Sequence, residues 1–149
     1  MRTGRQRLGD WGEQIVAKSC HCPSCKKNKT LKLLPTNFKC ADIICDFCGY
    51  LTQVKTAKVA DIESIPKYVL GGAWGTQKER MEAAIYFSLY LVLTTNDQKK
   101  YSIYYLSKDL QEKGMFAPRK PLSDTAKRAG WQGFRIELAE MSDRFVRLL

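Results

Sequence analysis

Two pairs of cysteines with metal-ligand spacing are the clearest chemical feature of this sequence. Cys22-Pro-Ser-Cys25 and Cys45-Asp-Phe-Cys48 are CxxC pairs with 19 residues between them. Each pair can place two thiolates on one side of a tight turn, and two pairs supply the four sulfur ligands of a tetrahedral zinc site. Gly49 follows the second pair, where such a turn needs a permissive backbone. The spacing predicts a closed, four-cysteine zinc knuckle, which is structural because no coordination position is left for water.

Three further residues of metal-binding type lie close to these pairs, namely Cys20, His21 and Cys40. Because the four-cysteine set is complete without them, we expect His21 to face solvent or to lie beside the ligands. The alternative for the cysteines is simple burial or disulfide formation. The chain shows no apolar leader and no apolar run long enough to cross a membrane, so we expect a cytoplasmic protein with reduced thiols. Reduced thiols favour metal binding by the two CxxC pairs over disulfide formation.

A second group of residues has the composition that metal-assisted cleavage of phosphodiesters requires. Asp42 lies just before the second CxxC pair, and Gln53 and Lys55 follow that pair. Gln53 and Lys55 are two residues apart, so in a strand their side chains share a face. Oxygen ligands that hold Mg²⁺ beside a lysine can activate a water and stabilise charge on a phosphate. Glu13 can add a carboxylate from the first helix. On spacing alone, a solvated strand face remains the alternative.

The net charge indicates the kind of partner. The chain has 25 Lys and Arg against 15 Asp and Glu, a formal net charge of +10 over 149 residues. This excess favours a polyanion, with nucleic acid first, although a merely basic surface would give the same count. Basic side chains gather late in the chain, at Lys108, Lys113, Arg119, Lys120, Lys127 and Arg128.

The elements that must position these residues follow from periodicity. Leu8–Ser19 predicts an amphipathic helix, preceded by a basic segment over Met1–Arg7 that is frayed or touches DNA. Alternation over Tyr50–Ala57 predicts a strand. The apolar run Ile85–Thr94 predicts a buried strand, joined by a turn to a partner strand over Tyr101–Leu106.

The remaining predicted elements are shorter. They are a helix over Thr76–Ala84, a loop at Gly71-Gly72, a basic loop over Phe116–Trp131 and a last strand over Phe134–Leu138. At this length, the mixture of helices and strands predicts one α/β core with the zinc knuckle inserted within residues 20–49.

Three stretches, in this order, resemble one nuclease family. Ala41-Asp42 precedes the second CxxC pair at the family's offset. Gly72-Ala73-Trp74, with Thr76 and Arg80, is a weaker match. Lys120-Pro-Leu-Ser-Asp-Thr-Ala-Lys-Arg-Ala-Gly-Trp131 strongly resembles the family's Lys-Pro-Leu-x-x-Thr-Ala-(Arg/Lys)-Arg-Ala-Gly-Trp stretch. From about Gly9 to Leu138 the chain is similar to the DpnI-like, Dam-replacing restriction endonucleases of the PD-(D/E)XK superfamily.

The resemblance implies a fold, an activity and a site. The fold would be a restriction-endonuclease-like mixed sheet with flanking helices. The activity would be Mg²⁺-dependent, type II cleavage of double-stranded DNA at adenine-methylated sites of the GATC type. Asp42 looks like the family's metal-binding aspartate, Gln53 stands at the family's second acid, and Lys55 looks like its catalytic lysine.

The resemblance also implies a DNA-binding set. Trp131 looks like the family tryptophan that meets the methylated bases, where an indole face can pack on methyl groups. The alternative for Trp131 is a core aromatic. Lys120, Lys127 and Arg128 lie beside it in sequence and would hold phosphates, which position a protein on DNA.

Two departures from the family pattern bear on activity. Gln53 replaces an acid that is usually Glu, and a neutral amide oxygen binds Mg²⁺ more weakly than a carboxylate. Catalysis would then lean on Glu13, or be slow or lost. Larger family members carry a C-terminal winged-helix domain that reads the same site. We expect residues 1–149 to be a single nuclease domain without it, so affinity would come from this domain or from a partner protein.

Two other functions stay open. A chain weakened or inactivated at Gln53 would be a methylated-DNA-binding module that does not cut. A zinc-ribbon module for RNA or the ribosome would fit the charge and the CxxC pairs, but it leaves the Lys120–Trp131 stretch unexplained.

Overall fold

The structure, a computed structural model, describes residues 3–35, 41–118 and 131–149. Its elements are α1 (Gly4–Ser19), β1 (Leu31–Leu33), β2 (Ile43–Cys45), β3 (Leu51–Lys58), β4 (Tyr68–Trp74), α2 (Gly75–Glu82), β5 (Ser88–Thr94), β6 (Tyr101–Leu106), β7 (Phe116–Pro118), β8 (Trp131–Glu137) and β9 (Val146–Arg147). Short 3-10 helices lie at Lys108–Leu110, Lys113–Met115 and Ala139–Arg144.

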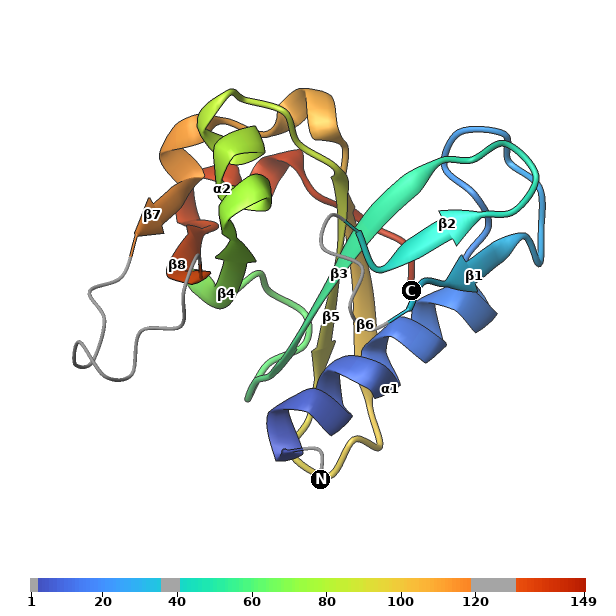
Figure 1. The fold of residues 1–149 in the computed structure, drawn as a ribbon. Helices are drawn as coiled ribbons and strands as arrows, with labels where there is room; N and C mark the ends of the chain where they lie inside the picture. The colour runs from blue at the N-terminus through green and yellow to red at the C-terminus, as the bar shows by residue number, and fades with distance from the viewer. Residues whose placement is uncertain (1–2, 36–40, 119–130) are drawn as a thin grey trace.

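The strands form two sheets (Figure 1). The larger has the order β1-β2-β3-β5-β6-β9, in which β3 and β5 are parallel and the other neighbours are antiparallel. The smaller sheet, β4-β8-β7, is antiparallel. Helix α1 packs along the larger sheet, and the small sheet lies with α2 on its other side. The mixed sheet, the flanking helices and the clustered cysteines confirm the predicted α/β fold class.

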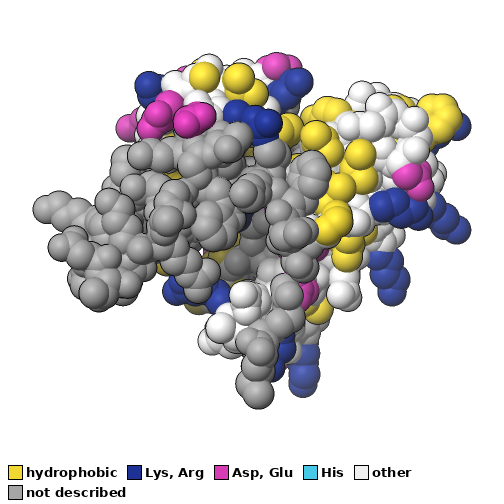
Figure 2. All heavy atoms as spheres, in the orientation of Figure 1, with side chains coloured by type: hydrophobic (Ala, Val, Ile, Leu, Met, Phe, Trp, Pro, Cys, Tyr) yellow, Lys and Arg dark blue, Asp and Glu magenta, His cyan; other side chains and the backbone are white. Residues whose placement is uncertain are grey.

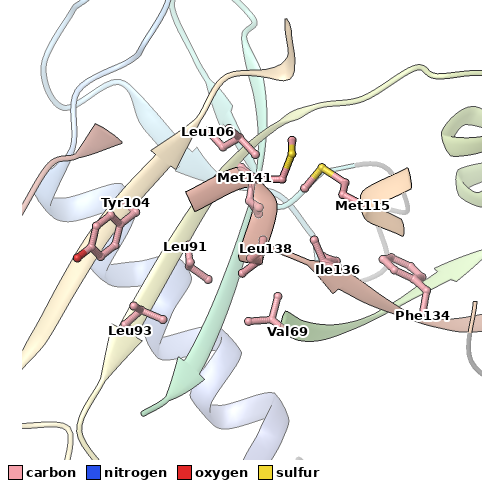
Figure 3. Close-up of a cluster of buried hydrophobic side chains, with 11 residues drawn as sticks. Val69, Leu91, Leu93, Tyr104, Leu106, Met115, Phe134, Ile136, Leu138 and Met141 are labelled. Atoms are coloured by element: carbon pink, nitrogen blue, oxygen red, sulfur yellow. The ribbon is translucent and has the colours of Figure 1, made fainter. Parts of the chain in front are cut away.

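Strand β5 is the centre of the core because both of its faces are covered. Leu91 and Leu93 belong to one buried cluster with Val69 of β4, and Figure 3 shows this cluster between the two sheets. Tyr90 and Val92 belong to a second cluster, which lies beneath α1. Every residue of β5 is buried, so the prediction of a buried strand from the continuous apolar run is confirmed.

Most other predicted elements appear within a few residues of their expected bounds. The structure gives β3, α2 and β6 where strand, helix and strand were predicted, and β8 covers the predicted last strand except for Leu138. The first residues of the predicted basic loop form β7, which pairs with β8. Residues 20–49, predicted to be rich in loops, also contain the short strands β1 and β2.

Helix α1 begins at Gly4, so the expectation that residues 4–7 are frayed is wrong, while the alternative that this segment touches DNA stays a prediction. The Thr3 side chain accepts the Gln6 backbone N–H at 3.2 Å, and the Gln6 side chain accepts the Thr3 backbone N–H at 2.8 Å. This reciprocal capping box satisfies two backbone donors that would otherwise lack partners at the start of the helix. The added turn places Arg5 on an ordered helix.

Gly71 and Gly72 lie inside β4, opposite Phe134 and Gly133 of β8, so the predicted loop at this pair is wrong. A Cβ atom on Gly71 would stand 3.0 Å from the Phe134 ring. The glycine therefore marks the close approach of an aromatic side chain to the backbone, as glycines within strands often do.

A glycine also sets the distance between α1 and the sheet. A Cβ on Gly12 would lie 1.8 Å from Oγ1 of Thr56 in β3. We expect Gly12→Ala to destabilise the fold by about 1–3 kcal/mol through overpacking, measured by denaturant unfolding. The control is Gly9→Ala, where no atom of the described residues lies within 4 Å of the added Cβ. This variant should be neutral or stabilised by up to about 1 kcal/mol from helix propensity. Equal stability of the two variants would contradict the close docking.

Candidate functional site

Four cysteines come together at one end of the larger sheet. The Sγ atoms of Cys22, Cys25, Cys45 and Cys48 all lie within 4.8 Å of one another. The Cys22–Cys48 and Cys25–Cys45 Sγ distances are 3.6 and 3.7 Å. Zinc–sulfur bonds of about 2.3 Å at tetrahedral angles place sulfurs about 3.8 Å apart. The four thiols therefore fit a tetrahedral site for a metal such as zinc, as the spacing predicted.

The two CxxC turns have the same hydrogen-bond pattern. In the first, Lys26 N–H donates to the Cys22 carbonyl at 3.0 Å; in the second, Gly49 N–H donates to the Cys45 carbonyl at 2.9 Å. Lys26 and Gly49 both have left-handed backbone, with φ of 66° and 80°. In each turn the N–H of the second cysteine also donates to the Sγ of the first, at 3.5 and 3.4 Å. These bonds orient sulfur lone pairs and support thiolate charge.

The nearby residues of metal-binding type do not join this group. Cys20 is buried and His21 is exposed, and neither belongs to the four-sulfur cluster of the described residues. The expectation that His21 lies at the surface is confirmed. Cys40 lies outside the described residues.

Asp42 lies at the entry to β2 and is held against β3 by two hydrogen bonds. Its backbone N–H donates to the Thr52 carbonyl at 3.0 Å, and its carboxylate Oδ2 accepts the Val54 backbone N–H at 2.8 Å. These contacts lie on either side of Gln53 along β3. Because Cys45 ends β2, the cysteine cluster anchors the short strand that follows Asp42. The predicted tie between the metal site and the Asp42 segment is therefore present in the fold.

Gln53 and Lys55 share one face of β3. In the parallel pairing with β5, Gln53 lies opposite Leu89 and Lys55 opposite Leu91, two residues of the core cluster between the sheets. Lys55 extends toward β4, where a Cβ on Gly71 would stand 3.5 Å from its Nζ. Its ammonium group is thus directed into the space between the larger and the smaller sheet.

The electrostatics link Lys55 to Asp42. Burial raises the pKa of the Asp42 carboxyl above its ordinary value, while the Lys55 ammonium and the Val54 N–H act in the opposite direction. The charge of Lys55 therefore acts on Asp42, although the two residues are 13 positions apart in sequence. A desolvated carboxylate is stabilised by any cation that binds it, so this site favours a bound metal ion when Asp42 is ionised.

A groove of about 540 Å³ lies beside Lys55, between the start of α1, the end of β3 and β4. Its lining includes the cations of Arg5, Lys55 and Lys58 and the exposed side chains of Tyr68 and Leu70. Cations next to aromatic and aliphatic surface suit a phosphodiester backbone with its sugars. A polyanion could therefore bind in this groove next to Lys55 of the candidate site.

Arg5 lines the groove, but the sequence did not predict its place in the fold. The helix was expected to begin after Arg5, and the segment before it was expected only to be frayed or to touch DNA. The Thr3-x-x-Gln6 capping box was the signal that could have found it. Arg80 of α2, noted before only as part of a weak match, lines a smaller hollow together with Gln53 and Lys55.

The other predicted site residues are Glu13, Trp131 and the three basic residues that precede Trp131. Glu13 follows Gly12 on α1, and Gly12 packs against Thr56 of β3. Trp131 opens β8, where its backbone pairs with Trp74 of β4. Lys120, Lys127 and Arg128 lie outside the described residues. The roles of all these residues stay predictions.

A comparison with known families decides the relationship. The model of the family described as "DpnI: Dam-replacing family" matches residues 2–147 of this chain. The chain belongs to the Dam-replacing, DpnI family. The predicted resemblance is thereby confirmed over almost the whole length.

Membership of the Dam-replacing family indicates the class of substrate that the site can act on. The family is one of restriction-type nucleases that act on methylated DNA, so DNA is the substrate class to be matched to the groove at Lys55. Within the part of the chain that the structure describes, no helix is both long enough and apolar enough to cross a bilayer.

Proposed function

We propose that this member of the Dam-replacing family is a Mg²⁺-dependent, type II restriction endonuclease that cleaves double-stranded DNA at adenine-methylated, GATC-type sites. The observation that carries the proposal is the Asp42 carboxylate, which is partly buried, fixed by the Val54 N–H and acted on by the Lys55 charge. Family membership and the basic groove beside Lys55 support it. These features belong together in a nuclease and have no common purpose in a simple binding surface.

The residues present fit a magnesium ion. Mg²⁺ prefers oxygen ligands and usually keeps several waters, with one or two carboxylates from the protein. Asp42 supplies one desolvated carboxylate, and the amide oxygen of Gln53 is the candidate second ligand from β3. When bound, the ion would polarise the phosphate and lower the pKa of an attacking water.

The chain's own residues have separate tasks in this proposal. Asp42 holds its carboxylate in one orientation because the Val54 N–H fixes Oδ2. Lys55 carries a positive charge in the space between the sheets, where it can stabilise the negative charge that develops on the phosphate. Arg5 and Lys58 hold the DNA backbone in the groove.

For recognition we propose the residues named from the resemblance. Trp131 would pack its indole face on the methyl groups, and Lys120, Lys127 and Arg128 would contact neighbouring phosphates. Glu13 is proposed as an additional acid that supports the metal site.

The replacement of an acid by Gln53 favours one alternative, a methylated-DNA-binding module with weak or absent cleavage. We expect Gln53→Glu to lower the Mg²⁺ concentration needed for half-maximal cleavage and to raise the rate about tenfold or more, since a carboxylate binds Mg²⁺ better than an amide. The measurement is nicking of a methylated duplex over a Mg²⁺ titration.

Gln111→Glu is the matched control for this variant. Gln111 lines the same small hollow as Gln53, but its side-chain amide donates to the Phe87 carbonyl. The control should not improve the Mg²⁺ dependence. If wild type binds methylated DNA without cutting it and only Gln53→Glu cuts, the binding-module alternative holds. If Gln53→Glu changes nothing in an active enzyme, Gln53 is not at the metal.

A further inference from the structure

The four-cysteine knuckle carries a basic surface that the proposed cleavage site does not use. Lys26, Lys27, Lys29 and Lys32 are exposed on it, together with Phe47, and we call these five residues the knuckle face. Figure 2 shows Lys and Arg side chains gathered over this arm of the molecule, beside a projecting hydrophobic group. Within the described residues, the lysines of this face form a single ion pair, Lys32 with Asp46 at 4.0 Å, and both side chains are more than half exposed. Such a pair leaves most of the positive charge available.

The backbone of the knuckle favours a functional reason for two of these lysines. The two CxxC turns are equivalent in hydrogen bonding, and the position that Gly49 fills in one is filled by Lys26 in the other. Lys26 has φ of 66° and Lys29 has φ of 61°, in the left-handed region that disfavours residues with a Cβ. Lysine therefore stands at two positions where glycine would be less strained. Strain of this kind is a reason to look for a function of the side chain.

Phe47 adds an aromatic group at the tip of the second turn. It is 64% exposed, and the Lys27 Nζ lies 4.2 Å from the centre of its ring. The first turn has Ser24 at the equivalent position, so the turn itself does not need an aromatic residue. A cation held over an exposed ring offers charge for a phosphate and a flat apolar surface for a sugar or base.

We propose that the knuckle face binds the phosphate backbone of duplex DNA outside the cleavage site, with Phe47 against the sugars. The inference rests on the proposed function, because it extends the contact of the same substrate. The knuckle holds the four clustered cysteines and is joined through β2 to Asp42. A DNA contact on the knuckle face therefore also sets where the cleavage residues stand on the duplex.

The test compares two double variants on DNA of two lengths. Lys27→Ala with Lys32→Ala removes charge from the knuckle face. Lys99→Ala with Lys100→Ala removes the same charge from the exposed turn between β5 and β6, which lines neither hollow at Lys55. Binding to methylated duplexes of about one and about three helical turns is followed by fluorescence anisotropy without Mg²⁺, over a range of salt concentrations. Metal content and unfolding midpoint are measured to show that each variant is folded.

We call the Lys27→Ala, Lys32→Ala protein the knuckle variant. On the long duplex we expect its slope of log affinity against log salt to be smaller in magnitude than that of wild type by about 1–2. The reason is that each lost phosphate contact reduces the magnitude of the slope by about 0.9. Its slope on the short duplex, and both slopes of the turn variant, should equal those of wild type. Phe47→Ala should weaken long-duplex binding without changing the slope, and Phe47→Trp should restore it.

Three results would overturn the proposal: an unchanged slope for the knuckle variant, an equal loss in both double variants, or equal competition by duplex RNA of the same length. If wild type binds no DNA of either length, the proposed function itself fails. If wild type binds and cuts DNA and the knuckle variant behaves as wild type, only the knuckle contact fails.

Discussion

Lys55→Ala should abolish most Mg²⁺-dependent cleavage while leaving the protein folded. Lys55 is the residue whose charge acts on Asp42, and its ammonium lies where β3 faces β4. Removing a group that stabilises transition-state charge in a partly dry site typically lowers kcat by about 10²–10³-fold. Single-turnover cleavage of a methylated duplex at saturating protein would measure the loss separately from binding.

Two further variants make this result specific. Lys55→Arg keeps the charge but changes its position, and it should retain more activity than the alanine variant while staying below wild type. Lys67→Ala, at an exposed position before β4, should cleave as wild type. Undiminished cleavage by Lys55→Ala would remove Lys55 from the site and with it the proposed pairing with Asp42.

Loss of the knuckle metal should have the second large effect. The four sulfurs at the end of β2 have the spacing of a tetrahedral metal site, and the segment entering β2 holds Asp42 against β3. Binding of structural zinc contributes about 10–16 kcal/mol in zinc-finger peptides, so its removal should unfold at least residues 20–49. We expect Cys45→Ser, or chelation, to lower the thermal midpoint and to eliminate cleavage together.

Cys20→Ser is the matched control for the metal. Cys20 is also a buried cysteine, but it is not among the four clustered sulfurs of the described residues. It should keep one bound zinc per chain, measured by elemental analysis, and should keep cleavage. Folded, untreated wild-type protein without zinc would refute the metal site, and full activity after complete chelation would refute its link to Asp42.

The parts of the fold that could be predicted from sequence are those set by local pattern. The CxxC spacing placed four sulfurs correctly because each turn is closed by its own hydrogen bonds, such as Lys26 N–H to the Cys22 carbonyl. The buried strand β5 followed from an uninterrupted apolar run, since both of its faces are covered. The helix start was also encoded locally, in Thr3 and Gln6, and was missed because the basic segment was expected to be frayed or to touch DNA.

The parts that could not be predicted depend on contacts between distant residues. Gly71 lies in a strand because the Phe134 ring packs over it, and nothing near Gly71 in sequence indicates that ring. The groove likewise forms only where β4 comes beside β3, so Arg5 could not be assigned to it. The spacing suggested only as a hypothesis that Asp42 and Lys55 come together. The electrostatic effect of Lys55 on Asp42 depends on how β2 lies beside β3, which the sequence does not show.

The measurement that tests the central claim most directly uses one plasmid prepared with and without adenine methylation. Each form is incubated with zinc-loaded, folded protein and Mg²⁺, with EDTA-treated samples as controls, and the products are separated on a gel. The proposed function predicts cutting of the methylated plasmid alone, at discrete sites, and only with the metal present. Cutting of both plasmids, cutting in EDTA, or no cutting of either by folded protein would contradict a Mg²⁺-dependent, methyl-directed endonuclease.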